Sequence, residues 1–92
     1  MKVIIREAAE DDLDRIFARI AQDNPPAAAT MVAAIRDRIS VLETDSLAHM
    51  GRPGLDHGTR ELIEYPYIIV DEVYENRSKV DVLAIVHGAR DR

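Results

Sequence analysis

The sequence predicts an α+β fold in which an N-terminal strand and a helical hairpin pack on an antiparallel sheet, in the order β-α-α-β-β-β. Two observations predict it. The apolar residues follow a helical period from Ala8 to Glu43, and after Thr59 they change to strand-like runs. The chain has 92 residues and no cysteine. We therefore expect a single domain over residues 1–92 that folds without disulfides.

The N-terminal segment predicts a strand at residues 2–6 and then a helix at about residues 8–23. The strand is indicated by a short run of β-branched residues, Val3 to Ile5. The helix is indicated by apolar residues at i, i+3, i+4 and i+7, namely Leu13, Ile16, Phe17 and Ile20. Acidic residues at positions 10–12 suit its positive N-terminal end. We expect the apolar stripe, Phe17 included, to be buried.

A second helix is predicted at about residues 25–44. Asn24 is a good N-cap residue, and Pro25 fits the first helical position, where its missing N–H costs nothing. Its apolar face comprises Val32, Ile35, Ile39 and Leu42, which we also expect to be buried. The break between the two helices is short, so they should form an antiparallel hairpin.

The C-terminal half predicts a loop and three strands. Glycine and proline residues mark a loop at residues 44–59. Strands are then expected at 60–65, 67–74 and 79–87, joined by connections short enough for an antiparallel meander. The last strand is apolar on both faces, which is typical of a strand inside a sheet.

Charge and hydropathy restrict the classes of partner. The net charge is −5, from 17 carboxylates against 12 Lys and Arg, and ten of these twelve cations are Arg. This balance opposes phosphate binding, whereas arginines also suit protein interfaces. The longest apolar runs have four residues, far below the ~20 that a membrane-spanning helix needs. We expect a cytoplasmic protein without membrane contact and without direct nucleic-acid binding by the free chain.

Few residues suggest chemistry. His49, His57 and His87 lack metal-ligand spacing, and no cofactor motif is present, so we expect neither metal nor cofactor. Arg60, His87 and Arg90 stand at predicted strand ends, where functional groups are often displayed. The structural alternative is that Arg60 pairs with a carboxylate such as Glu64 or Asp81, while His87 and Arg90 hold the chain terminus.

Four segments resemble the ParE/RelE superfamily of toxins from type II toxin–antitoxin modules, most of all its ParE-type plasmid-stabilisation branch: Gly51–Gly54, Gly58–Leu62, Pro66–Val70 and Val86–Asp91. The resemblance implies a small bacterial toxin with the predicted fold. It also implies a cognate, ParD-like antitoxin as partner and a hetero-oligomer with it. ParE toxins poison DNA gyrase and RelE toxins cleave mRNA on the ribosome, so the fold alone does not decide the target.

Compared residue by residue with the family, the sequence departs from the ribonucleolytic branch, which weakens the ribonuclease interpretation. Arg60, His87 and Arg90 match family positions that help to bind phosphate in the ribonucleolytic branch. Gly88, however, stands where some ribonucleolytic relatives have tyrosine, and Asp71 and Glu72 replace aromatic or basic residues.

RNA cleavage needs an acid, a base and cations for the phosphorane charge, and His87 has no evident second proton-transfer group beside it. We therefore expect a protein-binding toxin, with gyrase as the implied target, and no confidently assigned catalytic residue. Two alternatives stay open. One is a RelE-like endoribonuclease that uses Arg60, His87 and Arg90. The other is a non-toxic member that still binds antitoxin.

Overall fold

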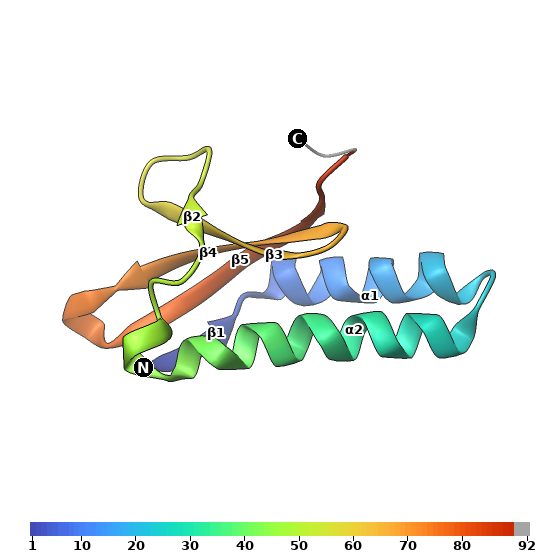
Figure 1. Cartoon of the computed structure of the whole chain (residues 1–92), viewed down its shortest axis with the longest axis horizontal. Coiled ribbons are helices and arrows are strands. Elements are labelled where there is room, and N and C mark those ends of the chain that lie inside the picture. The colour runs from blue at the N-terminus through green and yellow to red at the C-terminus, as the bar shows by residue number, and fades with distance from the viewer. Residues whose placement is uncertain (90–92) are drawn as a thin grey trace.

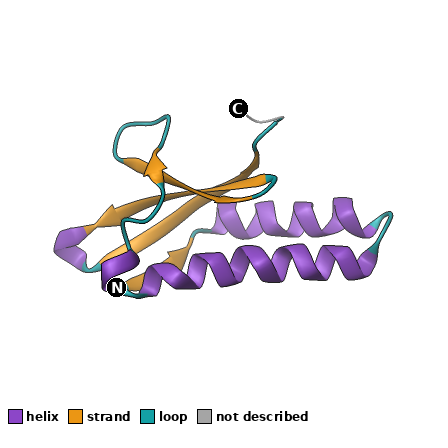
Figure 2. Cartoon of the chain, in the orientation of Figure 1, coloured by secondary structure: helices purple, strands orange, loops and turns teal. Residues whose placement is uncertain are grey.

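A computed structural model describes residues 1–89 of the chain, and Arg90 and the two residues after it lie outside this description. The elements, in chain order, are β1 (Lys2–Ile5), α1 (Glu7–Ala21), α2 (Pro25–Ser40), β2 (Arg52–Pro53), β3 (Thr59–Glu64), β4 (Tyr67–Tyr74) and β5 (Lys79–His87). Figure 1 shows the two helices side by side below a twisted sheet, and Figure 2 separates helices from strands by colour. The predicted α+β fold is confirmed.

The five strands form one mixed sheet in the order β1-β5-β4-β3-β2. The strands β3, β4 and β5 pair antiparallel in succession, as predicted for the meander, and β2 pairs antiparallel with β3. The N-terminal strand β1 instead runs parallel to β5, with Ile5 opposite Val82. The last strand thus has a neighbour on each side over its first residues. The short strand β2 falls inside the segment that the sequence predicted to be a loop.

The helical hairpin covers one face of the sheet and forms the core with it. At the hairpin turn, the side chain of Asn24 accepts a hydrogen bond from the backbone N–H of Ala27 at 3.0 Å, which confirms the predicted N-cap. An ion pair between Arg36 and Glu10, at 2.8 Å, links the two helices on their exposed side. The core contains Leu13, Ile16, Ile35, Ile39 and Leu42 from the helical region and Leu62, Tyr67, Ile69, Val80, Val82 and Ile85 from the sheet.

Two details of the helical prediction were wrong. Phe17 is 43% exposed, because the buried stripe of α1 follows Ala9, Leu13 and Ile16, and Phe17 lies on its flank. The second helix ends at Ser40 rather than near residue 44. From Val41 to Glu43 the chain continues as a 3₁₀ turn, which still buries Leu42. Ile20 and Val32 pack at the margin of the core and are partly buried.

The pairing of β4 with β5 contains a β-bulge. Val70 is opposite Ala84, but the next residue, Asp71, is opposite Val82, so Leu83 is left without a partner in the register. A bulge changes the alternation of side chains along its strand. Val82 and Ile85 therefore both face the helices although they are three residues apart.

Within residues 1–89, no helix is both long enough and apolar enough to cross a membrane.

Candidate functional site

The sheet has a second face, opposite the helices, which we call the open face. Side chains alternate between the two faces of a strand, so the neighbours of core residues point to this face. Asp81 lies between the core residues Val80 and Val82, and Glu72 is opposite Asp81 on the adjacent strand. The segment between β2 and β3 rises on the same side, away from the helices (Figure 1). The helices leave the open face uncovered (Figure 1).

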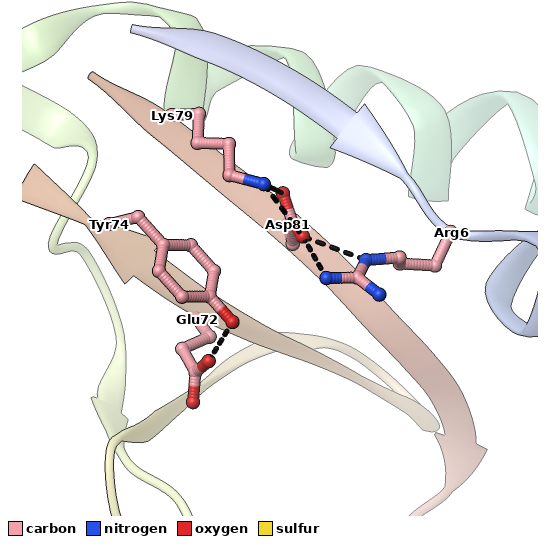
Figure 3. A network of polar contacts seen from close by, with 5 residues as sticks. All are labelled: Arg6, Glu72, Tyr74, Lys79 and Asp81. Atoms are coloured by element: carbon pink, nitrogen blue, oxygen red, sulfur yellow. Dashed lines mark hydrogen bonds and ion pairs between the residues drawn. The ribbon is translucent and has the colours of Figure 1, made fainter. Parts of the chain in front are cut away.

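A polar network lies on the open face around Asp81 (Figure 3). The guanidinium of Arg6 donates through Nε to Asp81 Oδ2 at 2.7 Å, and Lys79 Nζ lies 3.3 Å from Asp81 Oδ1. Lys79 also lies over the ring of Tyr74, 4.9 Å from its centroid, and the Tyr74 hydroxyl donates to Glu72. Four of the five residues come from β4 and β5, and Arg6 lies between β1 and α1.

The charge state of this network follows from its contacts. Asp81 is fully buried, and burial alone would raise the pKa of its carboxyl. The hydrogen bonds and charges of Arg6 and Lys79 together outweigh burial and hold the pKa of Asp81 below its ordinary value. The hydrogen bond and the charge of Asp81 in turn raise the pKa of Arg6. Both cations are therefore bonded to an internal carboxylate.

A second buried acid on the open face has a similar partner. Glu61 is 2% exposed, and Arg52, its neighbour across β2 and β3, donates to it through Nε at 3.2 Å. Arg52 itself stays largely exposed, so its stem covers the carboxylate while part of its charge faces solvent. Arg52 is the third cation of this face that is bonded to a carboxylate.

An apolar hollow lies next to Glu61 on the same face. It has a volume of about 260 Å³ and is lined by Leu55, Asp56, Thr59, Glu61, Val70, Leu83, Ala84 and Val86. Leu55, in the segment between β2 and β3, is 75% exposed at its margin. This segment is held in place because Thr59 donates through its hydroxyl to the carbonyl of Asp56 at 2.6 Å. Apolar side chains around a hollow of this kind suit contact with another protein.

Arg60 does not lie on the open face. Arg60 lies two positions before the core residue Leu62, so both side chains point to the helix side of the sheet. On β4, Arg60 is opposite Asp71. Its guanidinium donates to the carbonyl of Gly51 at 2.7 Å, while its Nε is buried without a hydrogen bond. Arg60 pairs with neither of the carboxylates expected from the sequence, because Asp81 is on the other face and Glu64 lies further along its own strand.

Asp71 is fully buried, and neither of its carboxylate oxygens has a hydrogen-bond partner. Burial raises its pKa to about 6, and the charges of Arg60 and His49 offset only part of this effect.

His87 ends β5 at the opposite end of the β3–β4–β5 pairing. It is in register with Tyr67, and the two rings meet edge to face with centroids 5.4 Å apart. Its Nδ1 accepts the backbone N–H of Ala89 at 3.1 Å.

Asp71, the partner of Arg60, lies four positions after Tyr67 on β4, which is about 13 Å along a strand. The structure does not bring Arg60 and His87 together, and Arg90 lies outside the described residues.

Over residues 1–89, no three His, Asp or Glu side chains are arranged to hold a metal ion. His49 contacts Glu75, and His57 is exposed in the segment before β3.

Sequence reasoning missed the network around Asp81. One signal was available: a single acid inside the apolar run of β5, with Lys79 two residues earlier on the same face. The contribution of Arg6 depends on the parallel pairing of β1 with β5, for which the sequence has no direct signal.

Comparisons with known proteins agree with this architecture. Residues 3–92 match the family model described as the ParE toxin of type II toxin–antitoxin system, parDE. The chain is 39% identical over 78 residues to Y4kP of Sinorhizobium fredii (strain NBRC 101917 / NGR234), which is named as a candidate toxin. That match covers 83% of this chain and 76% of Y4kP.

Two solved structures have the same fold. One is described as the chromosomal ParDE TA system from P. aeruginosa. Its matching chain has a TM-score of 0.81 and 23% identity, with 95% of both chains covered. The other is the RelBE2 toxin–antitoxin complex from Mycobacterium tuberculosis, with a TM-score of 0.67 and 18% identity. It covers 94% of this chain and 95% of the matching one.

Proposed function

Since the chain belongs to the ParE toxin family of type II toxin–antitoxin systems, we propose that it is a cytoplasmic single-domain toxin that acts by binding a protein target. We further propose that a cognate antitoxin neutralises it by forming a hetero-oligomer with it. DNA gyrase is the target that the family resemblance implies. The toxin class follows from the family. The mode of action is argued from the open face.

The proposal rests on one observation: three cations of the open face are bonded to buried carboxylates. Arg6 and Lys79 are bonded to the buried Asp81, and Arg52 is bonded to the buried Glu61. Binding of RNA needs cations that can contact phosphates, and it gains most of its affinity from them. Cations that neutralise internal acids contribute little to such binding. The open face therefore favours a protein partner over an RNA backbone.

The apolar hollow supports the same interpretation. Its walls are made largely of aliphatic side chains, including Leu55, Val70 and Val86. Such walls can enclose a side chain of a protein partner, and they offer few groups that recognise a base or a phosphate. The separation of Arg60 from His87 also speaks against a joint role of these two side chains at one scissile phosphate.

The antitoxin partner is supported by the family and by the two structural neighbours, which are both described as toxin–antitoxin systems. We propose that the neighbouring gene encodes this antitoxin. Co-expression of both genes, followed by size-exclusion chromatography, should yield one complex. If the neighbouring product never co-elutes with the chain, the partner proposal loses its basis.

A charge placed in the hollow tests the mode of action. Ala84 lines the hollow, and Ala29 is an exposed alanine of α2 that provides a matched substitution elsewhere. In a supercoiling assay with purified gyrase, we expect Ala84→Glu to weaken inhibition about tenfold or more, because the new carboxylate must be desolvated in the contact. Ala29→Glu should change inhibition less than twofold. Thermal unfolding of both variants checks that each is folded.

The alternatives have separate readouts. Primer extension on mRNA from induced cells would detect cleavage. Cleavage that disappears in His87→Ala or Arg60→Ala would replace the gyrase proposal by the endoribonuclease. A chain that forms the complex but does not arrest growth when expressed alone would be the non-toxic member of the family.

A further inference from the structure

The strand β5 has an unpaired side beyond the end of β1. The four residues of β1 cover only Lys79 to Val82, and the pairing ends where the backbone N–H of Arg6 donates to the carbonyl of Val82 at 3.0 Å. The chain then enters α1. Within residues 1–89, no strand pairs with Leu83–Val86 on this side. The second half of β5 is thus a sheet edge, although the strand lies inside the sheet over its first half.

A side chain from α1 occupies this edge. The carboxylate of Asp12 accepts the backbone N–H of Ile85 through Oδ2 at 2.9 Å, where an adjacent strand would provide a carbonyl oxygen. The other oxygen, Oδ1, contacts the guanidinium of Arg15. Charged side chains commonly protect strand edges from pairing with other chains. Asp12 is partly exposed, so it can move into solvent when another acceptor takes its place.

The surroundings of the edge are polar and carry positive charge. A cleft of about 270 Å³ lies between α1 and the end of β5, and it is lined by Asp12, Arg15, Ile16, Arg19, Tyr67, Ile85, Val86 and His87. Arg15 and Arg19 are exposed and lie one turn apart on the same helix. The chain as a whole carries a net charge of −5, whereas in the lining of this cleft Arg15 and Arg19 stand against the single acid Asp12. Arginine at such a site favours carboxylates.

We propose that Leu83–Val86 is a strand-addition site for an extended, acidic segment of the antitoxin. A backbone carbonyl of that segment takes over the N–H of Ile85 from Asp12, and its carboxylates pair with Arg15 and Arg19. Main-chain bonds would supply affinity, and the arginines would select for acidic side chains. The identity of the partner rests on the function proposed above, whereas the location rests on the edge geometry alone.

Hydrogen exchange of the Ile85 amide tests the location. In the free chain, Asp12→Ala should speed the exchange of this amide about tenfold or more, because the amide loses its acceptor. In the complex with the product of the neighbouring gene, the amide should be protected, and protection should no longer depend on Asp12. The matched control is Asp37→Ala on the exposed side of α2, which should leave Ile85 unchanged in both states.

Affinity measurements test the role of the arginines. Arg19→Gln leaves the contact between Asp12 and Arg15 intact, and we expect it to weaken the complex about threefold to tenfold. Arg77→Gln, in the exposed turn before β5, should change affinity less than twofold. Circular dichroism of both variants confirms that they fold.

Three outcomes would overturn the proposal, and they can be told apart. A complex of unchanged affinity with Arg19→Gln, in which Ile85 still depends on Asp12, would leave the toxin–antitoxin function standing and move the contact elsewhere. Dimerisation of the free chain together with protection of Ile85 at high concentration would assign the edge to a second copy. Failure of the wild-type chain to bind the neighbouring product would remove the partner and, with it, the proposed function.

Discussion

Two buried aspartates, on opposite faces of the same sheet, show how differently the fold treats one kind of side chain. Asp71 faces the helix side and Asp81 faces the open side, and both are fully buried. Asp81 contacts Arg6 and Lys79, and its pKa is lowered. Neither oxygen of Asp71 accepts a hydrogen bond, and its pKa is raised to about 6 by burial.

The difference teaches that burial does not decide whether a carboxyl is charged. Burial disfavours the charged form of both carboxyls, and only Asp81 has partners whose hydrogen bonds and charges outweigh that effect. For Asp71 the nearest cation across the sheet is Arg60, but that guanidinium donates to the Gly51 carbonyl. The helix side therefore holds an acid that is partly protonated near pH 6, whereas the open side holds a stable ion pair.

The largest expected effect concerns Asp71 and pH. Its folded-state pKa of about 6 exceeds the ordinary value of 3.8, so the folded state binds a proton more tightly than the unfolded state. Stability should therefore fall as pH rises from about 4 to about 7, by about 3 kcal/mol in total. Urea unfolding at several pH values measures this, and Asp71→Asn should remove the dependence. An identical pH profile in the variant and the wild type would show that another group is responsible.

The next effect concerns Asp81. We expect Asp81→Asn to cost about 2 kcal/mol at pH 7, because the substitution removes the charge that Arg6 and Lys79 bind. The pH dependence has the opposite sign to that of Asp71. Stability from a lowered pKa is present above the unfolded-state value and is lost as pH falls through the folded-state value, here below about pH 4. Urea unfolding at pH 7 should show no comparable loss for Asp37→Asn on the exposed side of α2.

The smallest expected effect on the free energy of unfolding concerns the apolar side chain of Phe17, whose contribution depends on packing rather than on charge. A fully enclosed phenylalanine costs about 3–5 kcal/mol when truncated to alanine. Phe17 is 43% exposed, so we expect Phe17→Ala to cost only about 1 kcal/mol. Thermal or urea unfolding measures the difference. A loss near 4 kcal/mol would mean that Phe17 is enclosed in solution, for instance by self-association, and a dilution series would detect this.

The fold was largely predictable because its signals are local. Helical spacing, the N-cap at Asn24 and the change of period after Thr59 each depend on residues close together in sequence. The prediction that Phe17 is buried failed because helical spacing identifies an apolar stripe but not how much of its width is covered. The helix α1 buries only the centre of that stripe. The direction of β1 also had no local signal, since its parallel pairing with β5 depends on how the helical hairpin and the later strands are placed relative to β1.

The candidate site was less predictable because it depends on register. Arg60 and His87 both stand at strand ends, yet the antiparallel pairing places them at opposite ends of the sheet. Arg6 and Asp81 are 75 residues apart and meet only because β1 runs beside β5. Asp12 and Ile85 are separated by 73 residues and meet across α1 and β5. Such contacts cannot be read from spacing along one segment.

The bulge at Leu83 has a consequence for how insertions and deletions act in this strand. An ordinary strand loses its pattern when one residue is removed, because every later side chain moves to the other face. Here one residue is already in excess, with Val82 and Ala84 paired to adjacent residues of β4. Removing Leu83 would make Val82 and Ala84 consecutive, so the pairing of β4 with β5 would become regular. Asp81 would stay on the open face and Ile85 would stay in the core. We therefore expect a deletion to be tolerated at Leu83, whereas a deletion elsewhere in β5 would move the side chains on one side of it to the other face.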